Sequence, residues 1–240
     1  MKRKFLINYA DITHYQAQVR NSDSGLTFGN FDEVIRFNKS YLSKDFLDRN
    51  AKIFAERKGA GLWLWKPYII YQALTKFTLD GDYIFYSDAG AEWIAPVDPL
   101  IDIVENEGIV LFHTDPVSGN TETQQTKADV FQKFCADDIK YYTSYPRHGG
   151  FQLYKNCNRA KDFIAAYLHF CQDYHLISDE ESIYPNFPDF KQHRHDQSIM
   201  SVLSKKYGIG SYRDPTQYGE PYIQQSDGYK TLINHTRKFD

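Results

Sequence analysis

Short runs of apolar residues alternate with longer amphipathic stretches along most of this chain. The short runs predict β-strands, and the stretches with apolar positions three or four residues apart predict α-helices. Strands are expected at residues 5–7, 33–37, 83–86, 108–113 and 149–154. Helices are expected at residues 43–54, 67–74, 126–134, 158–174 and 195–207, and the polar residues 21–25 predict a loop. This alternation indicates one α/β domain with a parallel or mixed central sheet flanked by helices.

The strand predicted at residues 83–86 ends close to a lone carboxylate, Asp88. Ligands of open α/β sheets bind beyond the carboxyl ends of the strands, so Asp88 is expected at the mouth of a site. Ala89 and Gly90 follow, and their small size leaves room for a bulky, charged ligand such as a metal-bound sugar nucleotide. An aspartate after a strand also forms ordinary Asx turns, and this segment alone does not distinguish the two possibilities.

The composition narrows the class of protein. The 240 residues suffice for one sizeable α/β domain, and 42% of them are hydrophobic. A net charge of -3 lacks the basic excess of nucleic-acid-binding proteins, so no nucleic-acid partner is expected. Three cysteines without metal-ligand spacing favour a reducing, cytoplasmic environment. No apolar stretch approaches the roughly 18 residues of a membrane span, so no such span is expected.

Lys66 lies between Trp65 and Pro67 at the start of a predicted helix. A cation is unfavourable at a helix N-terminus, so an anion is expected to compensate for it, and a bound phosphate is one candidate. The alternative is that the lysine extends over Trp65 toward solvent.

The segment 193–198 (HRHDQS) is a further candidate. Its histidines suit metal ligation, base catalysis or contacts with sugar hydroxyls, whereas Asp196 and Ser198 are equally suited to helix capping. The pair Gly149 and Gly150 allows either close backbone approach to a ligand or a tight turn.

Two isolated residues complete the candidates. Thr126 is expected to cap a helix, which would leave Lys127 directed outward and available to an acceptor or to water. His235, in the polar tail, either folds back onto a metal site or is simply solvated.

Together these segments resemble the small GT-A glycosyltransferases of bacterial and viral polysaccharide synthesis. The resemblance rests on ordered pieces that span most of the chain: 61–70 (GLWLWKPYII), 81–90 (GDYIFYSDAG), 126–131 (TKADVF), 149–151 (GGF) and, most specific, 193–203 (HRHDQSIMSVL). It implies a single domain in which a Rossmann-like nucleotide-binding half, about residues 1–115, joins an acceptor half, about residues 116–240. It also implies sugar transfer from a nucleoside diphosphate sugar, with a UDP-sugar favoured, to a saccharide or lipid-linked acceptor.

The resemblance further implies which residues contact each substrate. Asn8 and Tyr9, at the end of the first strand, match the usual seat of the nucleotide base. The rest of the donor site would comprise Lys66, Asp88, Ala89, Gly90 and Gln197. The acceptor is expected to contact Lys127, Gly149, Gly150 and His195.

Enzymes of this kind hold a divalent cation, Mn²⁺ or Mg²⁺, with an Asp-x-Asp motif at this strand end. Asp88 matches the first aspartate, but Gly90 stands where the second is usual, which puts metal dependence in question. Glu92 or His235 would then supply a missing ligand, and Asp88 with His235 is the expected pair.

The sequence leaves open whether the transfer inverts or retains the anomeric configuration. If the enzyme inverts, Asp196 is the candidate base. If it retains the anomeric configuration, the leaving phosphate guides the acceptor and Asp196 holds the donor sugar, and the Asp196-Gln197 pair slightly favours this outcome.

Two other functions are alternatives. A nucleotidyltransferase would require a Gly-rich basic loop after the first strand, which residues 11–15 lack. A non-catalytic carbohydrate-binding or scaffold protein would tolerate the loss of the carboxylate at Gly90.

Overall fold

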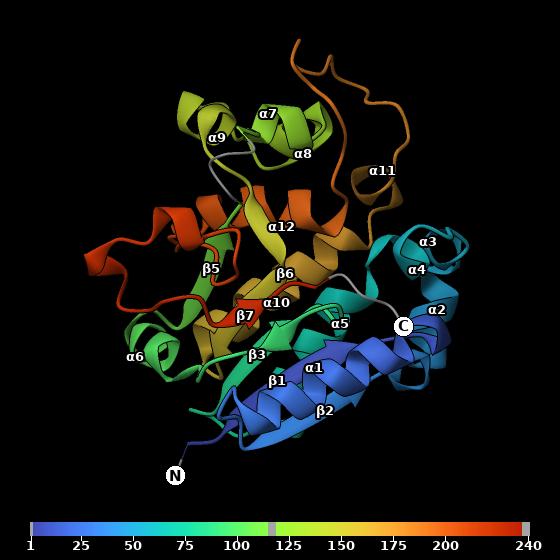
Figure 1. The fold of residues 1–240 in the computed structure, drawn as a ribbon. Coiled ribbons are helices and arrows are strands. Elements are labelled where there is room, and N and C mark those ends of the chain that lie inside the picture. Colours follow the sequence, from blue (N-terminus) through green and yellow to red (C-terminus); the bar gives the residue numbers. More distant parts are fainter. Residues whose placement is uncertain (1, 115–118, 237–240) are drawn as a thin grey trace.

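The computed structural model describes residues 2–114 and 119–236, and a five-stranded mixed sheet forms its centre (Figure 1). The strand order is β2-β1-β3-β6-β5. The strands are β1 (Lys4–Tyr9), β2 (Glu33–Phe37), β3 (Tyr83–Ser87), β5 (Ile109–His113) and β6 (Arg147–Lys155). β1 pairs in parallel with β2 and β3, whereas β6 runs antiparallel to β3 and β5. The expected α/β class with a mixed sheet is confirmed.

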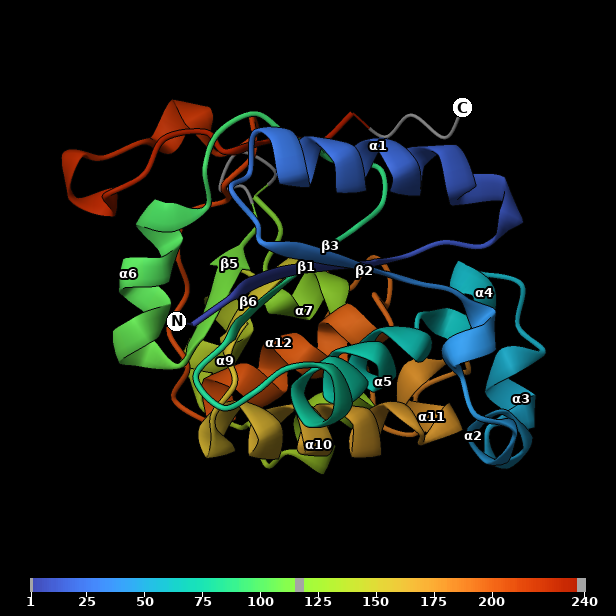
Figure 2. The ribbon, with the colours of Figure 1, turned by 90° about the horizontal axis from the view of Figure 1, so that it is seen from below.

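Helices cover both faces of the sheet (Figure 2). Helix α1 (Tyr15–Thr27) lies on one face, and α5 (Trp65–Gln72), α10 (Asn158–Cys171) and α12 (Asp196–Lys206) lie on the other. Side chains alternate between these faces, so Ile84 and Tyr86 of β3 join the core of α5, α10 and α12, while Phe85 joins a second core. That second core contains Trp93 and the buried side of α6 (Asp98–Glu107).

Shorter elements complete the chain. They are α2 (Lys44–Arg49), α3 (Ala51–Phe54), α4 (Gly59–Leu62), α7 (Glu122–Gln125), α8 (Ala128–Lys133), α9 (Ile139–Thr143), α11 (Tyr174–Ile177), β4 (Glu92–Trp93) and β7 (Ile233–Asn234). A π-helical turn, Ala73–Phe77, extends α5, and 3₁₀ turns occur at Ile12–His14, Lys39–Tyr41, Glu220–Tyr222 and Gln225–Asp227. β4 and β7 form a separate antiparallel pair.

One predicted helix cap is confirmed and another is wrong. Ser43 caps α2, since its side chain accepts a hydrogen bond from the backbone N–H of Phe46. Thr126 does not cap α8, because its hydroxyl donates to the carboxylate of Glu122 at 2.9 Å and the N-cap position belongs to Lys127.

The predicted loop at residues 21–25 is also wrong, because these residues belong to α1. The buried face of α1 is made of small and polar residues: Ala17, Gln18, Asn21, Ser22 and Gly25. A side chain at Gly25 would place its Cβ 2.4 Å from Leu6 Cδ2, so the helix packs very close to β1. The buried face of the helix therefore lacks the large apolar side chains from which a sequence pattern would reveal it.

This topology brings five chain segments to one edge of the sheet. The parallel strands β1 and β3 both end there, and the antiparallel strand β6 begins there. Helices α5 and α12 begin beside the same edge, at Trp65 and Asp196.

Within the described ranges, no helix combines the length and apolar character that crossing a membrane requires. The three cysteines are not joined by disulfides, and the cytoplasmic location stays a prediction.

Candidate functional site

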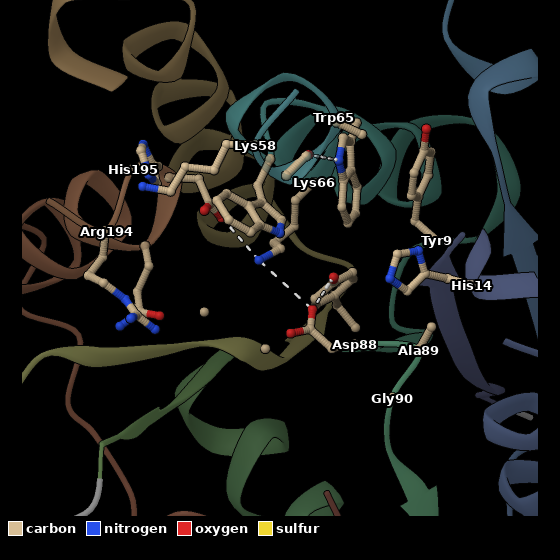
Figure 3. Close-up of a pocket in the computed structure, with 18 of the residues that line it drawn as sticks. Tyr9, His14, Lys58, Trp65, Lys66, Asp88, Ala89, Gly90, Arg194 and His195 are labelled. Carbon is tan, nitrogen blue, oxygen red and sulfur yellow. Dashed lines mark hydrogen bonds and ion pairs between the residues drawn. The ribbon is translucent and has the colours of Figure 1, made fainter. Parts of the chain in front are cut away.

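A cavity of about 630 Å³ opens at this edge, and residues from all five segments line it. Tyr9 and Trp65 stack in parallel at one end, with ring centroids 4.0 Å apart and planes 15° apart. Lys58 and Arg194 lie at the opposite end, and Lys66 and Asp88 lie between the two ends (Figure 3). The cavity thus runs from an aromatic end, past an ion pair, to a basic end.

Asp88 follows the last residue of β3 and directs its carboxylate into the cavity, with 37% of the side chain exposed. Its Oδ1 accepts a hydrogen bond of 2.5 Å from the hydroxyl of Tyr86, which lies two residues earlier on the same side of the strand. The ammonium of Lys66 is 3.9 Å from the same oxygen. Burial opposes ionisation of Asp88, but Lys66, Tyr86 and nearby histidines outweigh it and hold the pKa of the carboxyl below its usual value.

Lys66 is 3% exposed and lies between two carboxylates. Its Nζ is 3.1 Å from Oδ2 of Asp196 and 3.9 Å from Oδ1 of Asp88. Burial opposes its charge, but the two carboxylates outweigh burial and raise the pKa of Lys66 above its usual value. The alternative in which this lysine extends over Trp65 into solvent is therefore wrong. The two carboxylates already compensate its charge, and a contact with a donor phosphate stays a prediction.

Asp196 is the first residue of α12 and is only 2% exposed. Besides the contact with Lys66, its Oδ2 accepts a hydrogen bond of 2.8 Å from the hydroxyl of Tyr167 on α10. The negative charge also lies at the helix N-terminus, where it is favourable. Asp196 thus ties α5, α10 and α12 together beneath the cavity.

Gly149 and Gly150 lie inside β6, so they do not form the tight turn that was one alternative. A Cβ on Gly150 would lie 2.7 Å from Oδ2 of Asp88, and a Cβ on Gly149 would lie 3.1 Å from the side chain of Gln197. The two glycines therefore make room for side chains of the site itself. The backbone N–H of Gly150 also donates to Nδ1 of His148 at 2.9 Å.

The two histidines of the 193–198 segment are held differently. His193 donates from Nε2 to the carbonyl of Leu176 at 2.9 Å, is 4% exposed, and burial lowers its pKa well below the usual value. His195 donates from Nδ1 to the carbonyl of Ile177 at 2.8 Å, and burial lowers its pKa as well. Its φ of 53° is unusual for a residue other than glycine, and such strain is concentrated at functional sites.

Most of the predicted site residues line this one cavity. They are Tyr9, Lys66, Asp88, Ala89, Gly90, Gly149, Gly150, His195, Asp196, Gln197 and His235.

Two predicted residues lie elsewhere. Asn8 is fully buried on the other face of β1, where its amide donates to Asn21 and Ser22, so its assignment to the base site is wrong. Lys127 is 2% exposed, and its ammonium donates to the backbone carbonyls of His175, Ser178 and Glu180. It is therefore not directed outward, and the structure does not bring it to the cavity.

The sequence reasoning missed several residues that shape the cavity. Arg57, Lys58 and His148 line it, and the hydroxyls of Tyr86 and Tyr167 hold its two central aspartates. The two-residue spacing of Tyr86 and Asp88 along a strand was a usable signal for one of these contacts. The contact of Tyr167 with Asp196 carried no such signal, because α10 and α12 meet only in the fold.

The described residues do not present a ready set of ligands for a divalent cation. Within those ranges, no group of three or more His, Cys, Asp or Glu side chains is arranged to hold a metal ion. Asp88 and His235 both line the cavity, but Oδ1 of Asp88 is bound by Tyr86 and Gly90 supplies no carboxylate. Glu92 faces Arg20 at 3.7 Å and is not part of the lining.

Comparison with known proteins gives matches in structure alone. No protein-family model matches the sequence, and no curated protein matches it either. Mouse xyloside xylosyltransferase 1 superposes with a TM-score of 0.52 at 11% identity, over 98% of this chain and 97% of that one.

Two other structures are similar to the same extent. The galactosyltransferase LgtC, solved with donor and acceptor sugar analogues, matches with a TM-score of 0.51 at 13% identity, over 96% of this chain and 86% of that one. A glycosyltransferase involved in glycosylation of the major capsid of PBCV-1 matches with a TM-score of 0.51 at 12% identity, over 97% and 93% of the two chains. The chain therefore has the fold of the GT-A glycosyltransferases.

Proposed function

We propose that the protein is a glycosyltransferase that moves a sugar from a nucleoside diphosphate sugar to a saccharide or lipid-linked acceptor in glycan synthesis. The observation that carries the proposal is the ionised carboxylate of Asp88 at the carboxyl edge of β3, inside a cavity of about 630 Å³. A cavity of this size at this edge suits a nucleotide-sized ligand. The fold shared with known glycosyltransferases supports the same reading.

The lining suggests how such a donor would be oriented. The stacked rings of Tyr9 and Trp65 suit the nucleotide base, with a UDP-sugar as the favoured donor. The diphosphate would then lie beyond Asp88, and the sugar would face Gln197 near Gly149. His195 and Gly150 are the proposed contacts of the acceptor.

In the proposed reaction, the bond between the anomeric carbon and the diphosphate oxygen breaks, and its electron pair stays with the diphosphate. The acceptor hydroxyl oxygen forms the new bond to that carbon, and its proton passes to the departing diphosphate. Asp196 is ill suited to take this proton, because its carboxylate is buried and already bound by Lys66 and Tyr167. The poor suitability of Asp196 as a base supports transfer with retention of the anomeric configuration. NMR of the product, which reports this configuration, would test it.

The proposal is tested with a panel of UDP-, GDP- and dTDP-sugars. We expect one nucleotide class to raise the melting temperature and its sugar donor to be hydrolysed slowly. Asp88→Asn should lower turnover by about 100-fold or more, because it removes the charge at the reacting centre while keeping the side-chain shape.

The matched control is Asp102→Asn, which changes an exposed aspartate on α6 and should leave turnover unchanged. A protein that is stabilised by no donor and hydrolyses none would instead be a binding or scaffold protein on this fold. Wild-type turnover in Asp88→Asn would show that the site is wrongly assigned.

A further inference from the structure

The basic end of the cavity has no role in the proposal so far. Lys58 and Arg194 lie there, and Arg57, which precedes Lys58 in the chain, also lines the cavity. They come from the turn before α4 and from the segment before α12. In Figure 3, Lys58 and Arg194 lie across the cavity from Tyr9 and His14, on the far side of Asp88. We call these three residues the basic rim.

The charges of the basic rim are largely available to a ligand. Among the described residues, neither Arg57 nor Arg194 has a side-chain hydrogen bond or an ion-pair partner, and both are exposed. Lys58 pairs with Asp179 at 2.9 Å, but both side chains are more than half exposed, and such pairs contribute little. Lys66, in contrast, is already neutralised by Asp88 and Asp196.

The backbone around the basic rim is held in unusual conformations. Residues 59–63 all have positive φ, between 51° and 98°, which for alanine, leucine and tryptophan is unfavourable. His195, directly after Arg194, has a φ of 53°. Such conformations persist only where the surrounding structure imposes them, so the positions of the rim residues are set by the fold.

The part of the lining around Asp88 offers few ligands to a metal. Asp88 has one oxygen bound by Tyr86, Gly90 supplies none, and within the described ranges no third side chain joins Asp88 and His235 to hold a metal. Nδ1 of His148 accepts the backbone N–H of Gly150, so in the neutral ring the proton is on Nε2. That nitrogen is then a hydrogen-bond donor rather than a metal ligand, and a donor is what a phosphate oxygen needs.

From this distribution of charge we infer that the protein binds the diphosphate of its donor through the basic rim and the Nε2–H of His148, without a divalent cation. The inference rests on the proposed function and names how its leaving group is held. Arginine and lysine would neutralise the charge that the diphosphate gains when the anomeric bond breaks, which is the task usually given to a metal. Arginine suits phosphate oxygens because the guanidinium presents paired donors.

The experiment measures nucleotide binding rather than turnover. The full chain is dialysed against EDTA and titrated calorimetrically with UDP, GDP and dTDP, and the titrations are repeated with millimolar Mn²⁺. We expect one nucleotide to bind in EDTA with an affinity within about threefold of that with Mn²⁺, since protein cations already supply the charge.

Single variants then identify the groups that hold the phosphates. Lys58→Gln and Arg194→Gln should each weaken binding of the diphosphate by about tenfold and reduce its dependence on salt, while binding of the free nucleoside is unchanged. Both side chains are exposed, so neither substitution threatens folding. The control is Lys52→Gln, because Lys52 forms a similar exposed pair with Glu180 at 3.0 Å but does not line the cavity.

The outcomes separate this inference from the proposed function. Nucleotide binding that requires Mn²⁺, or that is unaffected by both rim variants, overturns the inference and leaves the glycosyltransferase proposal standing. Absence of binding by every nucleotide, with and without Mn²⁺, overturns both.

Discussion

Gly150 has no side chain, and the carboxylate of Asp88 occupies the space that a side chain would need. Gly150→Ala would place a Cβ 2.7 Å from Oδ2 of Asp88, so the carboxylate would have to move. We expect turnover of the sugar donor to fall by about 10- to 100-fold, since small displacements of a reacting group are costly. Gly210→Ala is the control, because its Cβ would meet nothing within 4 Å. Equal turnover in the two variants would contradict this account.

Lys66 and Asp196 form a buried pair, and each depends on the other. Removing one charge leaves its partner buried and poorly compensated, so Lys66→Met and Asp196→Asn should each lower the free energy of unfolding by about 3 kcal/mol. The double variant should lose clearly less than the sum of the two, because contacting residues are energetically coupled. Urea denaturation of all four proteins measures the coupling, and strict additivity would disprove it.

An exposed pair provides the comparison for this cycle. Lys44 and Asp48 are neighbours on the surface of α2, with side chains 87% and 60% exposed. Lys44→Met should change the free energy of unfolding by less than about 1 kcal/mol. The contrast would show that burial, rather than the presence of a salt bridge, sets the cost.

At the scale of elements, the turn at residues 59–63 shapes the wall of the cavity. Gly59 has a φ of +58°, and a Cβ there would lie 2.3 Å from the ring of Trp63, which lines the cavity. Gly59→Ala is therefore expected to destabilise the protein by about 2–3 kcal/mol and to weaken nucleotide binding, because the ring is forced from its place.

Gly208→Ala separates the backbone cost from the clash. Gly208 has a similar φ of +65°, but its Cβ would meet nothing within 4 Å. We expect this variant to lose only about 1 kcal/mol and to bind nucleotide normally. If thermal and urea unfolding show the same loss of stability in both variants, the contact with Trp63 does not contribute to the cost of Gly59→Ala.

For the molecule as a whole, four buried or half-buried histidines make stability depend on pH. Burial lowers the pKa of His113, His148, His193 and His195, so the folded protein binds protons at these rings more weakly than the unfolded chain does. Their contribution to stability is complete above about pH 6.5 and is lost as the pH falls toward the folded-state pKa values. Asp196 acts in the opposite direction, because burial raises its pKa.

Urea denaturation at about pH 7.5 and about pH 5.5 checks this expectation, since histidine titrates between them. The native protein should be less stable at the lower pH. His193→Gln, which keeps a donor for the carbonyl of Leu176, should show a smaller loss between the two conditions. A variant with the same pH dependence as the native protein would exclude His193 as a source of the effect.

The strands of the central sheet, the helices α5, α10 and α12, and the strand end that carries Asp88 could all be predicted from the amino-acid sequence. These features depend on neighbours in the chain: apolar runs bounded by glycine, helical spacing of apolar residues, and a polar residue after a buried strand. Such patterns also sufficed to mark Lys66 and the 193–198 segment as candidates, because each lies at the start of a helix.

The contacts of these residues, in contrast, depend on how the elements pack. Asn8 follows Ile7 directly but faces α1, because alternate residues of a strand point to opposite faces. Lys127 is buried because carbonyls from residues 175–180 surround its ammonium, a contact across about 50 positions. Lys66 likewise contacts Asp88 and Asp196 only because the fold brings distant segments of the chain together. Contacts between distant segments leave no periodic trace in a single sequence, so the partners of a buried charge are known only once the elements have packed.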